Sequence, residues 1–172
     1  MKKTIMAVLT LVCAAGAHAA SEDVTLHQVT AQGIGESIGK VTISETPYGL
    51  QFAPALSGLK PGIHGFHVHA KGSCEPGESA GKTVAAGAAG GHLDPHNSGK
   101  HLGPYADGHL GDLPALYVTD DGKASYPGVP PRLTSLSATH GKALMEHVRG
   151  ATPADQPHPL RGAVPPLAIV LP

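Results

Sequence analysis

The feature that most constrains this chain is a set of six histidines and one aspartate at separated positions, in a sequence with few cysteines. The chain has 12 histidines but only 2 cysteines among its 172 residues, which excludes a thiolate zinc site. Neutral imidazoles with a single carboxylate suit Zn²⁺ and Cu²⁺, whereas Ca²⁺ and Mg²⁺ require clustered oxygen ligands. The fold must therefore gather distant segments around metal ions. The residues concerned are His67, His69, His92, His101, His109, Asp112 and His147.

Residues 1–19 have the features of a signal peptide. Lys2 and Lys3 form a basic start, residues 5–15 are apolar, and Ala17-His18-Ala19 matches a small-residue cleavage site. The apolar stretch is shorter than the roughly 20 residues that span a bilayer. We therefore expect export, cleavage near Ala19, and a mature chain of residues 20–172 that forms a single domain.

The charge balance gives no sign of a nucleic-acid or membrane partner. Loss of the two leader lysines leaves 10 basic against 13 acidic residues and takes the formal net charge from −1 to −3. No basic excess favours nucleic acid, and the mature chain has no long apolar stretch that favours a membrane.

Short apolar segments separated by Gly and Pro predict an antiparallel β fold. Alternation is clearest in residues 40–44, where Val41 and Ile43 lie between polar neighbours. Residues 33–37 are expected to be a turn, 120–123 a hairpin turn, and 133–137 a single helical turn. The predicted strands are residues 24–33, 38–45, 50–56, 63–69, 116–118, 143–148 and 167–171.

Residues 90–113 are expected to depend on a metal for their structure. They are rich in Gly, His, Asp and Pro and have almost no apolar periodicity. A loop of this length without its own core needs another organising element, and metal binding can supply one because its free energy becomes folding free energy.

Two ligand sets follow from the spacing. His67 and His69 are two residues apart on a predicted strand and so project from one face; alone, such a pair is more often a surface feature. His92, His101, His109 and Asp112 can close a tetrahedral site without an open position, as a structural zinc requires. The alternative, a solvated His-rich loop, does not explain the acid beside the last histidine. His147 with His67, His69 and His92 gives an all-nitrogen set suited to Cu²⁺, and His92 would then serve both ions.

These motifs resemble the bacterial periplasmic copper,zinc superoxide dismutases over nearly the whole mature chain. Any one of them is weak evidence, but the combination is highly specific. The matching segments are His64-Gly65-Phe66-His67-Val68-His69, Gly72-Ser73-Cys74, Gly90-Gly91-His92-Leu93-Asp94-Pro95, Gly99-Lys100-His101, Gly108-His109-Leu110-Gly111-Asp112-Leu113-Pro114, Ala143-Leu144-Met145, His147-Val148 and Asp155-Gln156-Pro157.

The resemblance implies an all-β fold, an eight-stranded antiparallel Greek-key sandwich or flattened barrel with two long functional loops; this family is a known example of the sandwich architecture. It implies a periplasmic oxidoreductase, a monomer or homodimer. The enzyme would convert its substrate superoxide into O₂ and hydrogen peroxide by alternating reduction and oxidation of copper. Zinc would shape the site, and His92 would be both metal bridge and proton carrier. His64 would be a non-ligand that ties loops together.

One copper per subunit would be bound by His67, His69, His92 and His147, and one zinc by His92, His101, His109 and Asp112.

Three positions near the C-terminus depart from the family pattern. Pro166 stands where the family has an Arg beside the copper, and Ile169 where it has a second Cys, in the register that aligns Leu167-Ala168. Ala151 stands where an Asp links a copper histidine to a zinc histidine. Cys74 thus lacks its family partner, and a buried inert thiol is favoured over an intermolecular disulfide.

The departures leave alternatives open. Arg161, Arg149, Arg132 and Lys142 lie in segments that could border the channel, and Arg161 is the hypothesised substitute for the missing Arg. The competing function is a copper- and zinc-binding protein of the same fold with weak or no turnover. A third possibility is an unstable product of a decayed gene.

Overall fold

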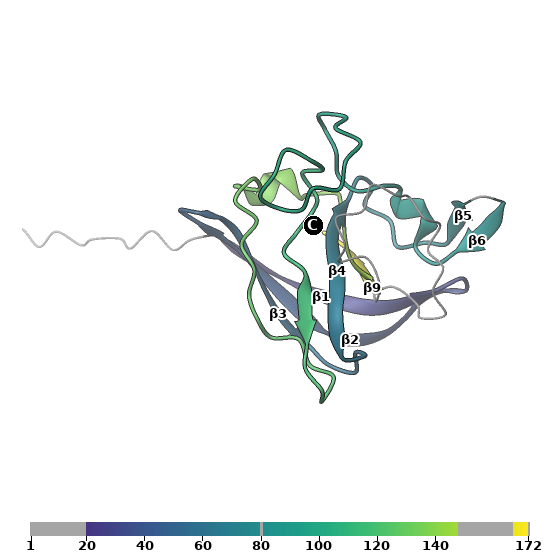
Figure 1. Cartoon of the computed structure of the whole chain (residues 1–172). Helices are drawn as coiled ribbons and strands as arrows, with labels where there is room; N and C mark the ends of the chain where they lie inside the picture. Colours follow the sequence, from purple (N-terminus) through teal and green to yellow (C-terminus); the bar gives the residue numbers. More distant parts are fainter. Residues whose placement is uncertain (1–19, 80, 148–166, 172) are drawn as a thin grey trace, which may run out of the picture.

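The computed structural model describes residues 20–79, 81–147 and 167–171, and in this part of the chain the fold is almost entirely β (Figure 1). Two 3₁₀ turns, η1 (Gly87–Ala89) and η2 (Leu136–Ala138), are its only helical segments. The strands are β1 (Ser21–Thr30), β2 (Gly33–Thr46), β3 (Gly49–Leu56), β4 (Gly62–His69), β5 (Gly77–Ser79), β6 (Lys82–Val84), β7 (Leu116–Val118), β8 (Ala143–His147) and β9 (Leu167–Val170).

Seven of these strands form one antiparallel sheet in the order β3-β2-β1-β9-β8-β4-β7. The segment after β7 closes the sheet, because it turns back and makes bridges from Ala124 to Leu56 and from Gly128 to Phe52 on β3. Residues 124–128 thus take the place of an eighth strand. The predicted Greek-key sandwich, or flattened barrel, is confirmed.

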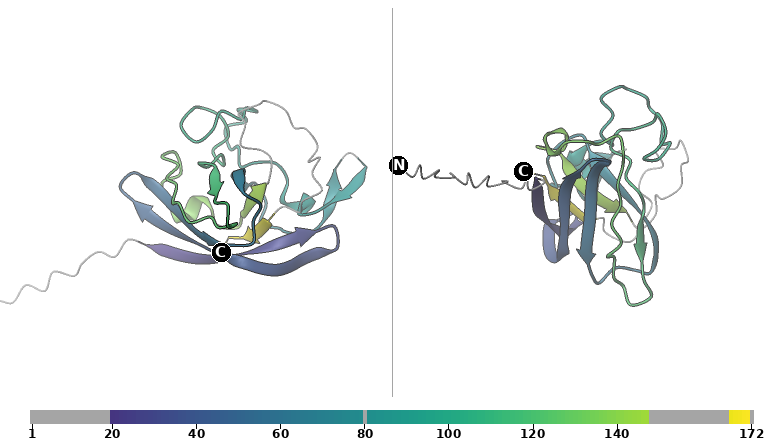
Figure 2. Two further views of the ribbon diagram at one scale, coloured as in Figure 1. Left: turned by 60° about the horizontal axis from the view of Figure 1, so that its bottom comes forward. Right: turned by 90° about the vertical axis from the view of Figure 1, so that its left-hand side faces the viewer.

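The core lies between the curved layer of β1, β2 and β3 and the strands β4, β7 and β8 that face it (Figure 2). Alternate side chains of the strands point inward, as the period-2 pattern predicts. Phe52 and Phe66 meet edge to face with their ring centroids 6.0 Å apart. A second, smaller cluster surrounds the buried Cys74 and contains Val29, Ala143 and Met145.

The structure differs from the predicted elements mainly at one turn. Residues 33–37 are strand, not turn, because β2 begins at Gly33 and pairs with β1 through Val29↔Ile34 and Thr30↔Gly33. The chain turns instead at residues 31–32. The helical turn expected at 133–137 lies at 136–138, and the small β5–β6 hairpin is not predicted.

Two long connections lie at the same end of the barrel and carry or support the predicted metal-binding residues. Residues 85–115 rise beyond the end of β4, and residues 127–142 run beside them (Figure 1). Among the described residues, no helix has the length and apolar character needed to cross a membrane.

Candidate metal centre

Two adjacent strands present three of the predicted copper residues on one face. The register Gly65↔His147, His67↔Met145 and His69↔Ala143 places the side chains of His67, His69 and His147 on the same side of the sheet. The opposite face carries Phe66, Val68 and Leu144, which are almost fully buried in the core. One hydrophobic face therefore fixes the histidines on the other.

The loop that supplies the remaining residues is attached to β4 by backbone hydrogen bonds. The amide of Val68 donates to the carbonyl of Gly111, and the amide of Leu93 donates to the carbonyl of Val68, both at 2.8 Å. Position 111 must be glycine, because a Cβ there would lie 2.2 Å from the Val68 carbonyl oxygen. This close contact brings His92 and Asp112 against His69 and His67, with which they form isolated β-bridges.

His67, His69, His92 and His147 form what we call the four-histidine cluster. Each residue offers one ring nitrogen such that these atoms all lie within 4.8 Å of one another. Nε2 of His69 is 3.3 Å from Nε2 of His147. Nδ1 of His69 donates to the carbonyl of Gly90 at 2.8 Å, which fixes the tautomer and leaves the Nε2 lone pair free to bind a metal.

Ring nitrogens without partners show that this site suits a metal ion. Nδ1 of His67 and Nδ1 of His147 are buried and make no hydrogen bond among the described residues, and Nδ1 of His109 is in the same position. Buried polar atoms are nearly always paired, so the unpaired Nδ1 atoms of His67 and His109 need another partner. A metal cation is the partner that this donor set favours.

His92, His101, His109 and Asp112 form the second group, the Asp112 cluster. Oδ1 of Asp112 lies 3.0, 3.6 and 3.8 Å from Nδ1 of His92, His101 and His109. Zinc bonds of about 2.0–2.1 Å in a tetrahedron place ligand atoms roughly 3.3 Å apart. The observed separations are close to this value, so these four residues fit a zinc ion with little rearrangement.

Burial keeps the imidazoles neutral, as metal ligands must be. Desolvation lowers the pKa of His147 to about 3 and that of His69 to about 4, and repulsion between neighbouring histidines adds to both shifts. The same two causes hold the pKa of His67 well below its usual value. The histidines around Asp112 outweigh the effect of its burial and lower the pKa of its carboxyl group.

Two residues support the Asp112 cluster in roles that the sequence analysis does not predict. Arg132 donates to the carbonyls of Ala106 and Gly108 at 2.5 and 3.0 Å and so holds the loop that carries His109. Asp94 accepts hydrogen bonds from the amides of Ser98 and Gly99, which closes the turn that leads to His101. Because Arg132 is occupied in this way, it is not available as a substitute for the family Arg.

The structure gives His64 and Cys74 definite environments. His64 is buried, and its Nδ1 hydrogen-bonds to Glu146 of β8, so among the described residues its side-chain partner is a strand residue and not a loop. Cys74 is a free thiol, 3% exposed, as expected for a buried residue. The departures at Ala151 and Pro166 and the hypothesis for Arg161 lie outside the described residues.

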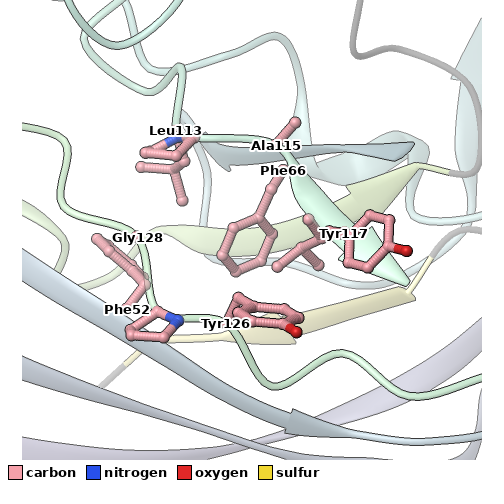
Figure 3. Close-up of a pocket in the computed structure, with 10 residues that line it drawn as sticks. Phe52, Phe66, Leu113, Ala115, Tyr117, Tyr126 and Gly128 are labelled. Carbon is pink, nitrogen blue, oxygen red and sulfur yellow. The ribbon is translucent and has the colours of Figure 1, made fainter. Parts of the chain in front are cut away.

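Figure 3 shows the residues that line a small cavity of about 80 Å³. Its lining is largely apolar and includes Phe52, Phe66, Tyr117 and Tyr126, and none of the metal-binding candidates borders it. Phe66 belongs to the core face of β4, opposite His67. The chemistry of this protein is therefore to be sought at the histidines and not in this cavity.

Comparison with known proteins identifies the family. The sequence model of copper/zinc superoxide dismutase (SODC) matches residues 37–168. Superoxide dismutase [Cu-Zn] of Escherichia coli K12 is 59% identical over 162 residues, which are 94% of each chain. The chain belongs to the copper/zinc superoxide dismutase family.

Solved structures of other family members agree with this fold. The Cu/Zn superoxide dismutase of Brucella abortus has a TM-score of 0.83 at 45% identity. The monomeric copper, zinc superoxide dismutase of Salmonella enterica has a TM-score of 0.78 at 55% identity. Each comparison covers 89% of this chain and 100% of the other.

Proposed function

We propose that this chain is a superoxide dismutase that binds one copper and one zinc. Copper is held by His67, His69, His92 and His147, and zinc by His92, His101, His109 and Asp112. The observation that carries the proposal is the pair of ligand clusters that share His92. When bound, the copper supplies the one-electron oxidation and reduction that convert superoxide into O₂ and hydrogen peroxide.

His92 is the residue that connects the two clusters. Its Nδ1 lies 3.0 Å from Oδ1 of Asp112, so its Nε2 is the nitrogen available to the four-histidine cluster. An imidazole can bind a metal through either nitrogen and can carry a proton on one that is free. His92 would thus act as metal bridge and proton carrier, and the zinc that it would share with Asp112 would orient its ring and tune its basicity.

The other residues hold the reactive centre in place and limit the access of water. His69 is oriented by its hydrogen bond to Gly90, and His67, His69 and His147 are each less than 9% exposed. Superoxide is a small anion, so a shaped apolar pocket is unnecessary. Attraction by positive charge governs its approach, an effect for which this family is a known case.

Export is the second part of the proposal. The features of residues 1–19 support cleavage before Ala20 and release of residues 20–172 into the periplasm as a monomer or homodimer. Cell fractionation combined with N-terminal sequencing of the mature protein tests the location. A cytoplasmic protein that retains Met1 would contradict it.

The decisive experiment measures superoxide turnover per bound copper on residues 20–172, with both metals quantified in the same sample. We expect dismutation at a rate below the diffusion limit of about 10⁹ M⁻¹s⁻¹, because Pro166 and Ala151 replace the Arg and the Asp of the family. A rate that approaches this limit would mean that another cation replaces the missing Arg. Full occupancy by both metals with negligible turnover would favour instead a metal-binding protein of the same fold. That result would place the defect at the departures of Ala151 and Pro166 from the family pattern.

Single variants test the ligand assignment independently of turnover. His147→Ala should lose copper and keep zinc, whereas His101→Ala should lose zinc and keep copper. His92→Ala should weaken the binding of both ions, because it belongs to both clusters. Metal analysis after dialysis gives the stoichiometry of each variant. Unchanged copper content in His147→Ala would show that the assigned set is wrong.

A further inference from the structure

A buried carboxylate next to the four-histidine cluster has no role in the function proposed above. Glu146 is 0% exposed and His64 is 1% exposed, and Nδ1 of His64 hydrogen-bonds to Oε1 of Glu146. The other oxygen, Oε2, has no partner among the described residues. A buried carboxylate is costly unless it is well paired, so this arrangement needs a reason.

The pair lies on the core face of the two strands that carry copper histidines. Both side chains share that face with Phe66, Val68 and Leu144, which are apolar and buried. His64–Glu146 is the only polar pair on this face of β4 and β8. The hydrophobic residues around it give many equivalent contacts, whereas the hydrogen bond has one geometry.

The position of this hydrogen bond along the ladder is informative. His64 and Glu146 lie diagonally across the pair Gly65↔His147, so their hydrogen bond crosses directly behind the backbone of His147. On the metal-binding face, Gly65 offers no side chain to support His147 from the facing strand. The support that β4 gives at this pair therefore comes from the core face.

We propose that Glu146 is a positioning residue. Through its hydrogen bond to His64 it fixes the register and spacing of β4 and β8 at the residue pair Gly65↔His147. A shift of one residue in register would move His147 to the core face and Glu146 to the metal-binding face. A buried polar pair opposes such a shift because misplaced partners remain unpaired in an apolar core. The inference rests on the proposed function, since it assumes that His147 binds copper.

The test compares variants by the EPR spectrum of bound Cu²⁺ and by copper affinity in competition with a chelator. Glu146→Leu removes the carboxylate, and Glu146→Gln keeps an acceptor for His64. We expect Glu146→Leu to shift the EPR signal and to weaken copper binding about 10-fold or more. Loss of a group that positions a ligand from outside the coordination shell typically has an effect of this size. Glu146→Gln should keep the wild-type spectrum.

The double variant His64→Leu/Glu146→Leu covers the case in which Glu146→Leu alone does not fold. Replacement of both members of a buried pair by apolar residues is often neutral or stabilising, so this protein should fold. Its EPR spectrum should still be shifted. A folded double variant with the wild-type spectrum and copper affinity would overturn the proposal, as would a shifted spectrum in Glu146→Gln.

Leu144→Ala is the matched control, because it lies on the same strand and face and is equally buried. It should lower thermal stability and leave the copper spectrum unchanged. An equal shift in Leu144→Ala would reduce Glu146 to a structural role and overturn the inference. His147→Ala separates the two proposals. If it binds copper like the wild type, the ligand assignment fails and the positioning role falls with it. If it loses copper while the folded double variant keeps the wild-type spectrum and affinity, only the positioning role fails.

Discussion

The buried imidazoles of His69 and His147 make the metal-free protein sensitive to mild acid. Their pKa values in the folded protein are about 4 and about 3, against 6.5 for an ordinary histidine. Below pH 6.5 these histidines become protonated in the unfolded chain but stay neutral in the folded chain. The free energy of unfolding therefore decreases as the pH falls. Full stability is thus present above pH 6.5 and is lost progressively toward pH 3.

We predict that the free energy of unfolding of the metal-free protein falls between pH 7 and pH 4, by about 1.4 kcal/mol per pH unit for each such histidine. Urea denaturation at a series of pH values measures this slope. His69→Gln should make the slope shallower, because one of the buried histidines with a lowered pKa no longer titrates. A stability that is independent of pH over this interval would contradict the prediction.

The thiol of Cys74 should be inert in the native protein. It packs among Val29, Ala143 and Met145, and burial raises its pKa to about 11. At pH 8 only about one molecule in a thousand then carries the reactive thiolate. We predict slow modification by a thiol reagent in the native state and rapid modification in denaturant. Fast native modification, or a disulfide-linked dimer on a non-reducing gel, would show that the side chain is accessible.

The histidines and the aspartate that form the two clusters could be predicted from the sequence, because such a combination of residue types is specific. The roles of Glu146 and Arg132 could not. Glu146 looks like any polar residue in a strand until the register shows that it faces the core beside His64. Arg132 donates to backbone carbonyls 24 to 26 residues away. Every residue has a backbone carbonyl, so the sequence does not indicate which of them Arg132 contacts.

At the scale of elements, strands were easier to predict than the turns between them. The alternation in residues 40–44 marks β2 clearly, whereas Gly33 and Gly35 suggest a turn that the pairing with β1 overrides. The loop over residues 90–113 illustrates the opposite case. It has no periodicity, yet hydrogen bonds through Leu93 and Gly111 attach it to β4. Such attachment depends on tertiary contacts and not on local propensity.

The attachment of this loop through Arg132 leads to a prediction about zinc. Arg132→Gln removes the hydrogen bonds to Ala106 and Gly108 and loosens the segment that carries His109. We expect zinc affinity to fall about 10-fold, because His109 loses support from outside the coordination shell of the metal. Copper affinity should stay within a factor of two or so, because His109 does not belong to the four-histidine cluster. Competition with a chelator measures both constants.

Lys123→Gln is the control for the loss of positive charge. Lys123 is exposed and pairs with Asp121 in the turn after β7, where it touches neither cluster. Its zinc affinity should match that of the wild type. If Arg132→Gln and Lys123→Gln lower zinc affinity equally, the change in net charge and not the loss of loop support would explain the effect.

For the whole molecule, the metals should contribute directly to stability. The Asp112 cluster joins a long loop to the barrel, and the four-histidine cluster joins that loop to β4 and β8. A ligand that binds only the folded state stabilises it by about 4 kcal/mol when its concentration is 1,000 times the dissociation constant. For a chain of this length, 1 kcal/mol corresponds to roughly 2–4 °C in melting temperature.

We therefore predict that removal of both metals lowers the melting temperature by roughly 10 °C or more, as measured by calorimetry at pH 7. His101→Ala should lose the increase in melting temperature that is due to zinc and keep the increase that is due to copper. His147→Ala should lose the increase due to copper and keep the increase due to zinc. If both variants lose the whole effect, the ions bind cooperatively through His92. Equal melting temperatures with and without metals would mean that the ions do not bind the folded chain in preference to the unfolded chain, which would contradict both ligand sets.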